Sequence, residues 1–323
     1  MLRITSRTLL NSHVQETVKG RSLPPTINEI VAADFSEIEA IGDSPARGIF
    51  ILKHIPTDGL LVGKLLNQDV SKSALPAEIR MTCNLLHPRL VRGYGYIKYS
   101  DNEAVLLQEY IPGQDLGKKI QSMHEMKHSD VMRYMTHVME AVDYLHTNNI
   151  AHRDIKASNI VIDDLNNSVK LIDLGLACHV GNVFEAQIAC GSPASMAPEV
   201  WNMVHDGTDN TPIDLLRADV WSCGILFFTM LFGTMPWQEL SLTPERYIKV
   251  MLAQCPLVVG GSSLLTLLRS MLYAKPKKRP RASDVLQALK GQAFGVSDLS
   301  TWRMAFKYTR LLSKDTKRNA AEA

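Results

Sequence analysis

The feature that most constrains the fold is a run of polar residues that leads into a short hairpin. The run, His152–Asn159, contains an acid, a lysine and an amide. Two short apolar segments follow it, Ile160–Ile162 and Val169–Ile172, and the Asn-Asn-Ser sequence between them is typical of a hairpin turn. Asp173 stands directly after the second segment. Because the two ends of a hairpin lie side by side, the pattern predicts that Asp173 returns to the polar run.

These side chains suit the transfer of a phosphoryl group. A carboxylate such as Asp154 can accept the proton of a nearby hydroxyl, and the ammonium group of Lys156 can neutralise a transferring phosphoryl group. Asn159 and Asp173 supply the hard oxygen ligands that magnesium prefers. The hairpin therefore predicts a single centre that holds a base, a cation and a metal site.

The chain before Pro112-Gly113 has the pattern of an antiparallel sheet. Its apolar segments are short and bounded by turn residues, and they are Gly48–Ile55, Gly59–Leu66 and Ala104–Tyr110. One helix is predicted among them, near Ala77–Leu86.

The chain after Pro112-Gly113 is predicted to be mainly helical. One apolar face recurs with helical spacing behind Ser129, the expected N-cap, and is formed by Val131, Met135, Val138, Val142 and Leu145.

In order and spacing, these motifs resemble the eukaryotic protein kinase family, in its serine/threonine branch. His152–Asn159 resembles the catalytic loop, and Asp173-Leu174-Gly175 stands where relatives carry Asp-Phe-Gly. The resemblance covers about residues 36–290. It implies an α+β, two-lobed fold, with a small antiparallel β-sheet lobe and one main helix in residues 34–112. A larger, mainly α-helical lobe would occupy residues 113–292.

The resemblance also implies a reaction, in which the γ-phosphoryl group of ATP passes, with Mg²⁺, to a serine or threonine hydroxyl of a protein substrate. Asp154 would orient and deprotonate that hydroxyl, and Lys156 would stabilise the transferring group. Asn159 and Asp173 would hold the metal.

A set of nucleotide-binding residues follows from the same resemblance. Lys64, fixed by Glu78, would hold the α- and β-phosphates, and Glu109-Tyr110-Ile111 resembles the hinge that binds adenine through its backbone. Gln108 would guard the inner pocket. The full predicted set is Ile41, Gly42, Ile49, Val62, Lys64, Glu78, Glu109, Ile111 and Asp115.

The activation segment that follows Asp173 carries two further expectations. In many relatives the arginine in the position of Arg153 pairs with a phosphate on this segment. This chain has no Ser, Thr or Tyr from Asp173 to Gly191, so we expect no switch by loop phosphorylation. Glu185 is either a fixed carboxylate partner for Arg153 or a plain solvated residue. Beyond it, Ser192 resembles part of the substrate-docking end, and Arg279 resembles the buried partner of Glu199.

The glycine-rich loop departs from the family pattern. Ser44 and Arg47 stand where glycines are usual, and Pro45 lies between them. Side chains and proline restrict the backbone where it would approach the phosphates. Thr82 also replaces a usual apolar residue, and Val62 a usual alanine. These departures leave open an alternative function, a pseudokinase scaffold that acts through protein contacts.

Composition bounds the partners and the compartment. The 35 Lys and Arg against 33 Asp and Glu leave a net charge of +2, which favours no nucleic-acid partner. The five cysteines are scattered and contain no Cys-x-x-Cys pair, so we expect reduced thiols and a cytoplasmic chain. Arg3 and Arg7, with no acid before Glu16, leave a mitochondrial location as the alternative.

The two ends of the chain differ from the middle. Residues 1–33 show no sustained period, and Pro24-Pro25 interrupts them, which predicts a disordered extension. Residues 293–323 predict a helical tail with a basic stripe at Arg303, Lys307, Arg310 and Lys314. A solvated helix is the main interpretation of the tail, and docking to an acidic partner or an anionic membrane surface is the alternative. Nothing in the sequence predicts the oligomeric state.

Overall fold

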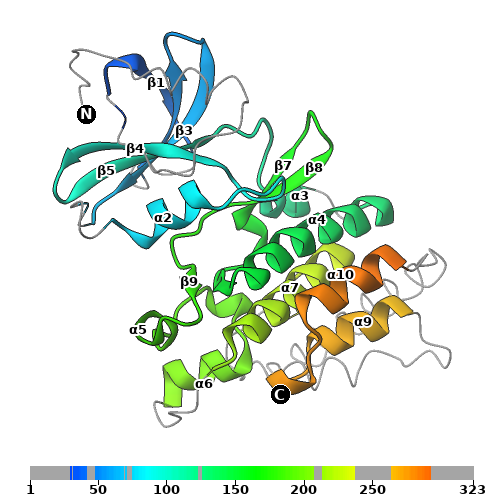
Figure 1. The fold of residues 1–323 in the computed structure, drawn as a ribbon. Helices are drawn as coiled ribbons and strands as arrows, with labels where there is room; N and C mark the ends of the chain where they lie inside the picture. The colour runs from blue at the N-terminus through cyan, green and yellow to red at the C-terminus, as the bar shows by residue number, and fades with distance from the viewer. Residues whose placement is uncertain are drawn as a thin grey trace, which may run out of the picture.

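The computed structural model describes residues 30, 32–41, 48–68, 70, 75–122, 126–206, 213–236 and 263–291. The described residues form two lobes, a sheet above and a group of helices below (Figure 1). The predicted α+β, two-lobed architecture is confirmed. The basic tail, Gly42 and almost all of residues 1–33 lie outside the described residues.

The upper lobe is built on one antiparallel sheet. Its strands are β1 (Phe35–Ala40), β2 (Ile49–His54), β3 (Gly59–Leu66), β4 (Gly93–Ser100) and β5 (Glu103–Glu109), after a short turn of 3-10 helix, η1 (Ala32–Asp34). The strand order is β1-β2-β3-β5-β4, and helix α2 (Ala77–Asn84) packs on β4. The predicted sheet and its single helix are thus confirmed, and each apolar segment predicted as a strand forms one.

The register of the sheet gathers several side chains on one face. Ile49 lies opposite Lys64, and Val62 lies opposite Gln108. Directly opposed residues in an antiparallel pair share a face, and so do residues two apart on one strand. Ile49, Val62, Lys64 and Gln108 therefore all lie on the same face of the sheet.

The lower lobe is mainly helical. Its helices are α3 (Leu116–Ser122), α4 (His128–Thr147), α5 (Val183–Ala186), α6 (Pro198–Asp206), α7 (Leu215–Phe232), α9 (Ser263–Met271) and α10 (Ala282–Gly291). Its short strands pair as β6 (Ile150–Ala151) with β9 (Cys178–His179) and as β7 (Ile160–Asp163) with β8 (Ser168–Leu171). The remaining turns of 3-10 helix are η3 (Ala157–Asn159), η4 (Pro193–Ser195) and η5 (Pro276–Lys278).

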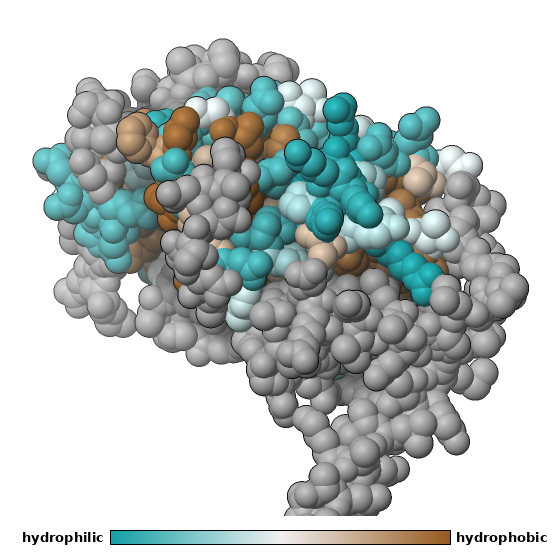
Figure 2. Space-filling model, turned by 90° about the horizontal axis from the view of Figure 1, so that it is seen from below, coloured by the Kyte–Doolittle hydropathy of each residue, from teal (hydrophilic) through white to brown (hydrophobic). Residues whose placement is uncertain are grey.

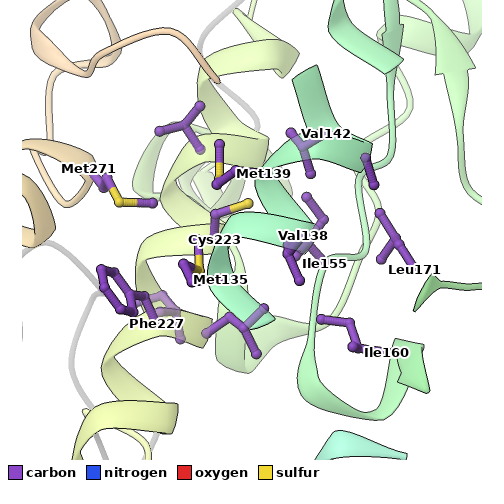
Figure 3. Close-up of a cluster of buried hydrophobic side chains, with 14 of the residues drawn as sticks. Met135, Val138, Met139, Val142, Ile155, Ile160, Leu171, Cys223, Phe227 and Met271 are labelled. Atoms are coloured by element: carbon purple, nitrogen blue, oxygen red, sulfur yellow. The ribbon is translucent and has the colours of Figure 1, made fainter. Parts of the chain in front are cut away.

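Two helices form the centre of the lower lobe. The apolar face of α4 packs against α7 and α10, and Met135, Val138, Met139 and Val142 belong to one buried cluster with Cys223, Phe227 and Met271 (Figure 3). By length and composition α7 could cross a membrane, but 78% of it is buried inside the lobe. Such burial is typical of the core helix of a folded domain.

One predicted boundary is wrong. Ser129 was expected as the N-cap of α4, but the helix begins at His128 and its cap position is occupied by Lys127, two residues before Ser129. The cap residue makes no side-chain hydrogen bond. The helix is instead stabilised by the burial of its apolar face, which does not specify the first turn.

A buried ion pair ties the two ends of the lower lobe together. The guanidinium of Arg279 donates to both carboxylate oxygens of Glu199, at 2.6 and 2.7 Å, and lies over the ring of Trp221. This is the architectural pairing that the sequence predicted.

Candidate active site

A side chain on α7, Asp219, holds the start of the polar run His152–Asn159 through hydrogen bonds. One carboxylate oxygen of Asp219 accepts the backbone N–H of His152 at 2.8 Å, and the other accepts that of Arg153 at 2.9 Å. Arg153 has a φ of +66°, in the left-handed region that a side chain rarely adopts. The two hydrogen bonds from Asp219 hold this strained backbone and so fix the position of the next residue, Asp154.

Asp154 is buried, and each of its carboxylate oxygens has its own donors. Oδ1 accepts the backbone N–H of Ser192 at 3.0 Å and its hydroxyl at 2.7 Å. Oδ2 accepts from Lys156 Nζ at 2.7 Å and from Asn159 Nδ2 at 3.0 Å. Lys156 Nζ also donates to the Ser192 hydroxyl at 2.7 Å. The carboxylate, the ammonium group and one hydroxyl therefore meet at a single point.

The hairpin of β7 and β8 brings Asp173 back to the polar run, as predicted. The backbone N–H of Ile172 donates to the carbonyl of Asn159 at 2.9 Å, so the residues on either side of the hairpin are in contact. Asp173 has a φ of +66° and a half-exposed carboxylate. The Asn159 amide donates to Asp154 through its nitrogen, which leaves its oxygen available.

These donors fit a magnesium ion that is shared with phosphates. Asn159 and Asp173 offer an amide oxygen and a carboxylate oxygen, which are hard ligands. Among the described residues there is no group of three or more His, Cys, Asp or Glu that could hold a metal. A magnesium ion would therefore take its remaining ligands from water and from the phosphates of a nucleotide, the usual arrangement at phosphoryl-transfer sites.

Lys64 joins the upper lobe to the site. Its Nζ donates to Glu78 Oε1 on α2 at 2.6 Å and to Asp173 Oδ1 at 2.8 Å. Burial lowers the pKa of the Lys64 ammonium, but the two carboxylates outweigh burial and raise it above its usual value. Burial raises the pKa of Asp173, but Lys64 outweighs it and the pKa falls below the usual range. Burial raises the pKa of Glu78, and Lys64 offsets this only in part.

Most of the predicted nucleotide residues border the face of the sheet that carries Lys64. Ile49 and Val62 share that face, and the N–H of Ile41 donates to the carbonyl of Ile49 at 2.8 Å where β1 and β2 end. Gly42 lies outside the described residues. The sheet therefore brings Ile41, Ile49 and Val62 close to Lys64.

The connection between the lobes is held by Glu109. Its carboxylate accepts from Lys170 Nζ on β8 at 2.6 and 2.7 Å and from the backbone N–H of Arg92 at 2.8 Å. Among the described residues, none accepts a hydrogen bond from the backbone N–H of Ile111. Asp115 uses its carboxylate to cap α3, by accepting the N–H of Lys118 at 2.9 Å. The sequence carried no signal for the pairing of Glu109 with Lys170.

One expectation about the activation segment, the pairing of Arg153 with the Glu185 carboxylate, is wrong. The Glu185 carboxylate was expected to pair with Arg153, but it lies 4.0 Å from Arg80 on α2. The Arg153 guanidinium donates instead to the backbone carbonyls of Leu176, Glu185 and Ile188, at 2.6, 2.6 and 3.0 Å. The side chain of Glu185 points elsewhere because α5, capped by the side chain of Asn182, directs only its carbonyl at the arginine.

The two lobes, the catalytic loop and the lysine bound to two carboxylates together define a protein kinase domain. The family model of that name, the protein kinase domain, matches residues 35–289. The chain therefore belongs to this family.

Curated relatives agree with the serine/threonine branch that the motifs indicated. The chain is 30% identical over 256 residues to maternal embryonic leucine zipper kinase of Xenopus tropicalis, covering 77% of this chain and 37% of the relative. It is 29% identical over 259 residues to CBL-interacting serine/threonine-protein kinase 3 of Arabidopsis thaliana, covering 76% and 56%. It is 27% identical over 249 residues to CBL-interacting protein kinase 11 of Oryza sativa subsp. japonica, covering 74% and 47%. In each case the chain spans less than two thirds of the relative's length.

Proposed function

We propose that this chain is an active protein kinase, which transfers the γ-phosphoryl group of ATP, with Mg²⁺, to serine or threonine hydroxyls of proteins. The observation that carries the proposal is that Lys64 Nζ reaches Glu78 and Asp173 at 2.6 and 2.8 Å in the same structure in which Asp154, Lys156 and Ser192 form one network. The lysine, the general base and the second cation that the proposed reaction uses are thus all held by hydrogen bonds in one arrangement.

The Ser192 hydroxyl supports the choice of acceptor. It donates to Asp154 at 2.7 Å and accepts from Lys156 at 2.7 Å, which are the contacts that an acceptor hydroxyl would need. A serine or threonine hydroxyl at the same place would lose its proton to Asp154, while Lys156 would neutralise charge on the transferring group. Lys64 would hold the α- and β-phosphates. Magnesium, held by Asn159 and Asp173, supplies charge neutralisation at the phosphate oxygens.

The scaffold alternative rests on the glycine-rich loop, where Ser44, Pro45 and Arg47 replace or separate the usual glycines. A pseudokinase has no need of a complete catalytic set. Lys64, Asp154, Asn159 and Asp173 are all retained, and each is joined to another member of the site by a hydrogen bond of 3.0 Å or less, which favours the enzyme.

The test is transfer of radiolabelled phosphate from ATP with Mg²⁺ to a generic protein substrate, followed by phosphoamino acid analysis. We expect phosphoserine or phosphothreonine. Asp154→Asn should lower the rate by about a hundredfold or more, the usual contribution of a positioned general base, without lowering the melting temperature. A wild-type rate of transfer no higher than that of Asp154→Asn would favour the scaffold. A product that is chiefly phosphotyrosine would contradict serine and threonine as acceptors.

A further inference from the structure

The turn that joins α9 to α10 carries a cluster of exposed basic side chains that the proposed reaction does not use. The turn contains η5, and its exposed cations are Lys275, Lys277, Lys278 and Arg281. Among the residues that the structure describes, no carboxylate forms an ion pair with any of the four. In the sequence, Asp284 is the only acid from residue 273 to residue 291, and its carboxylate accepts the backbone N–H of Arg281 at 2.8 Å. The turn is therefore strongly positive, on a chain whose net charge is only +2.

The turn is held in one conformation from the inside. The side chain of Arg279 is buried, and its guanidinium donates to the backbone carbonyls of Tyr273 and Ala274 at 2.6 and 3.0 Å. Pro276 and Pro280 restrict the backbone further, because the proline ring fixes φ. The one buried arginine thus anchors the turn, while the neighbouring cations stay in solvent. A partner would meet a preformed cluster, so binding would cost little ordering of the backbone.

The turn lies far from the cleft between the lobes. In Figure 1 it is the orange segment below α9 and α10, at the lower end of the large lobe. Figure 2 views the molecule from that end, and strongly hydrophilic side chains lie at the surface near the middle of the view. The ring of Tyr273, at the start of the turn, is 48% exposed. We call the four cations together with Tyr273 the η5 patch. A partner bound to it would leave the candidate active site open.

The chemistry of the η5 patch favours an extended anionic surface over a single anionic group. Three of its four cations are lysines, whose ammonium groups are point charges without the rigid fork by which arginine holds one phosphate or carboxylate. A membrane with anionic lipids attracts such clusters through its negative surface potential, and each Lys or Arg near the surface strengthens binding about fivefold. Tyrosine is enriched at membrane–water interfaces, because its ring is apolar and its hydroxyl is polar.

We propose that the η5 patch docks the large lobe on a membrane surface that contains anionic lipids. The lipid headgroups supply the negative charges that the patch lacks among its own described neighbours. The attachment is electrostatic and reversible, and it weakens as the salt concentration rises. The inference is independent of the proposed kinase activity, because no residue of the patch belongs to the candidate active site.

The experiment measures the partition of the full chain onto sedimenting vesicles, without ATP. The vesicles contain phosphatidylcholine alone or phosphatidylcholine mixed with phosphatidylserine. We expect binding to the mixed vesicles only, and a loss of about tenfold or more when the salt is raised from about 0.1 M to about 0.5 M. The triple variant Lys275→Gln/Lys277→Gln/Lys278→Gln should lower the partition coefficient about a hundredfold, in line with the loss of three cations at the surface.

The matched control removes three lysines from other elements. Lys53→Gln/Lys118→Gln/Lys127→Gln changes the net charge by the same amount, on β2, on α3 and before α4. It should lower the partition coefficient by less than about threefold, because charges farther than a Debye length from the membrane are screened. Melting temperatures equal to that of the wild type verify that both triple variants are folded.

The other outcomes overturn the inference. An equal loss of binding in both triple variants would show that the net charge, rather than the η5 patch, attracts the vesicles. Binding that survives in the η5 variant, or equal binding to phosphatidylcholine alone, rejects the docking surface. Tighter binding to a short DNA duplex or to polyglutamate than to the mixed vesicles, at equal concentration of negative charge, would identify a different partner. All of these results leave the proposed kinase activity standing, since no phosphoryl transfer is measured.

Discussion

Asp154 is oriented by donors on both of its oxygens, and Ser192 supplies two of the four. The hydroxyl of Ser192 bridges Asp154 and Lys156, at 2.7 Å to each. Hydrogen bonds to charged groups are worth about 1.5 to 3 kcal/mol, so this single hydroxyl can set the orientation of both proposed catalytic side chains. Ser192 is therefore a positioning residue.

Removal of this hydroxyl should slow the reaction without weakening nucleotide binding. We expect Ser192→Ala to lower kcat by about tenfold or more, corresponding to the loss of one charged hydrogen bond. Ser192→Thr, which keeps a hydroxyl, should retain most of the activity, and the KM for ATP should change in neither variant. Steady-state kinetics measure this, and an alanine variant as active as the wild type would show that the hydroxyl is not needed.

Lys64 permits a second test at the same scale. Its replacement leaves Glu78 and Asp173 close together without a cation, so Lys64→Met should lower the melting temperature as well as abolish nucleotide binding. In the wild type, ATP with Mg²⁺ should raise the melting temperature, because a ligand that binds only the folded state stabilises it. Thermal shift measurements with and without ATP test both effects. A nucleotide-induced shift that persists in Lys64→Met would contradict the assigned role.

Single residues also show where prediction from sequence stops. The pairing of Lys64 with Glu78, and the return of Asp173 to the polar run, could be predicted because each residue stands in an ordered motif. The partners of Arg153 could not, since they are backbone carbonyls of Leu176, Glu185 and Ile188. Any residue type can supply a carbonyl, so only the path of the chain decides which ones converge.

At the scale of elements, the packing of α2 and the sheet leaves two buried polar groups of the described residues without hydrogen-bond partners. Thr82 is fully buried and Gln108 nearly so, and among the described residues neither the Thr82 hydroxyl nor the Gln108 Nε2 has a hydrogen-bond partner. The backbone of Gly93, opposite Gln108 on β4, packs directly against Thr82, since a Cβ there would lie 2.8 Å from the Thr82 carbonyl. Each unsatisfied buried group costs about 1–3 kcal/mol.

The packing of α2 should therefore improve when the hydroxyl is removed. We expect Thr82→Val, which keeps the shape of the side chain, to raise the melting temperature by about 2–4 °C for each kcal/mol recovered. The matched control is Thr229→Val on α7, whose buried hydroxyl donates to the carbonyl of Ile225 at 2.8 Å and should give no gain. Calorimetry measures the melting temperatures of the two variants. An equal change in both would contradict a gain from removing the unpaired Thr82 hydroxyl.

The activation segment is held in place by hydrogen bonds that involve no phosphorylated side chain. Three carbonyls from two parts of the segment converge on Arg153, and α5 is capped from within by Asn182. Three N–H groups of the Arg153 guanidinium thus already bind the segment through its backbone, so its order does not depend on a phosphate.

Treatment with a phosphatase should accordingly leave the activity unchanged. The assay compares the initial rate before and after treatment, with removal of phosphate followed by mass spectrometry. A large loss of activity, mapped to Ser192 or Ser195 at the docking end, would show that phosphorylation does order the segment.

Element boundaries were predicted less well than element types. Three strands of the upper lobe, β2, β3 and β5, follow from short apolar segments between turns, and their ends differ from the prediction by one residue at most; β1 and β4 were not predicted. The start of α4 was wrong because no cap side chain defines it; tertiary burial of the apolar face does. A local sequence pattern reports such burial along the helix but not at its ends.

At the scale of the whole molecule, four histidines are held in the neutral form. Burial lowers the pKa of His54, His87, His137 and His152 in the folded protein. On α4, burial lowers the pKa of His137 to about 4, helped by the nearby cations Arg89, Arg133 and Lys290 and opposed by the charge of Glu140. These residues lie in both lobes, so their effect on stability is global.

The sign of the effect follows from proton binding. A histidine in the unfolded chain binds a proton near pH 6.5, whereas the folded protein resists protonation until a lower pH. Below about pH 6.5 the unfolded state therefore binds more protons, and the free energy of unfolding decreases as the pH falls. We expect the melting temperature to drop between pH 7.5 and pH 5.5, and His137→Asn to make that drop smaller. His179→Asn, at an exposed position, serves as the control and should leave the slope as it is. Melting curves across this pH range provide the measurement, and a melting temperature that rises on acidification would contradict the neutral state of the buried histidines.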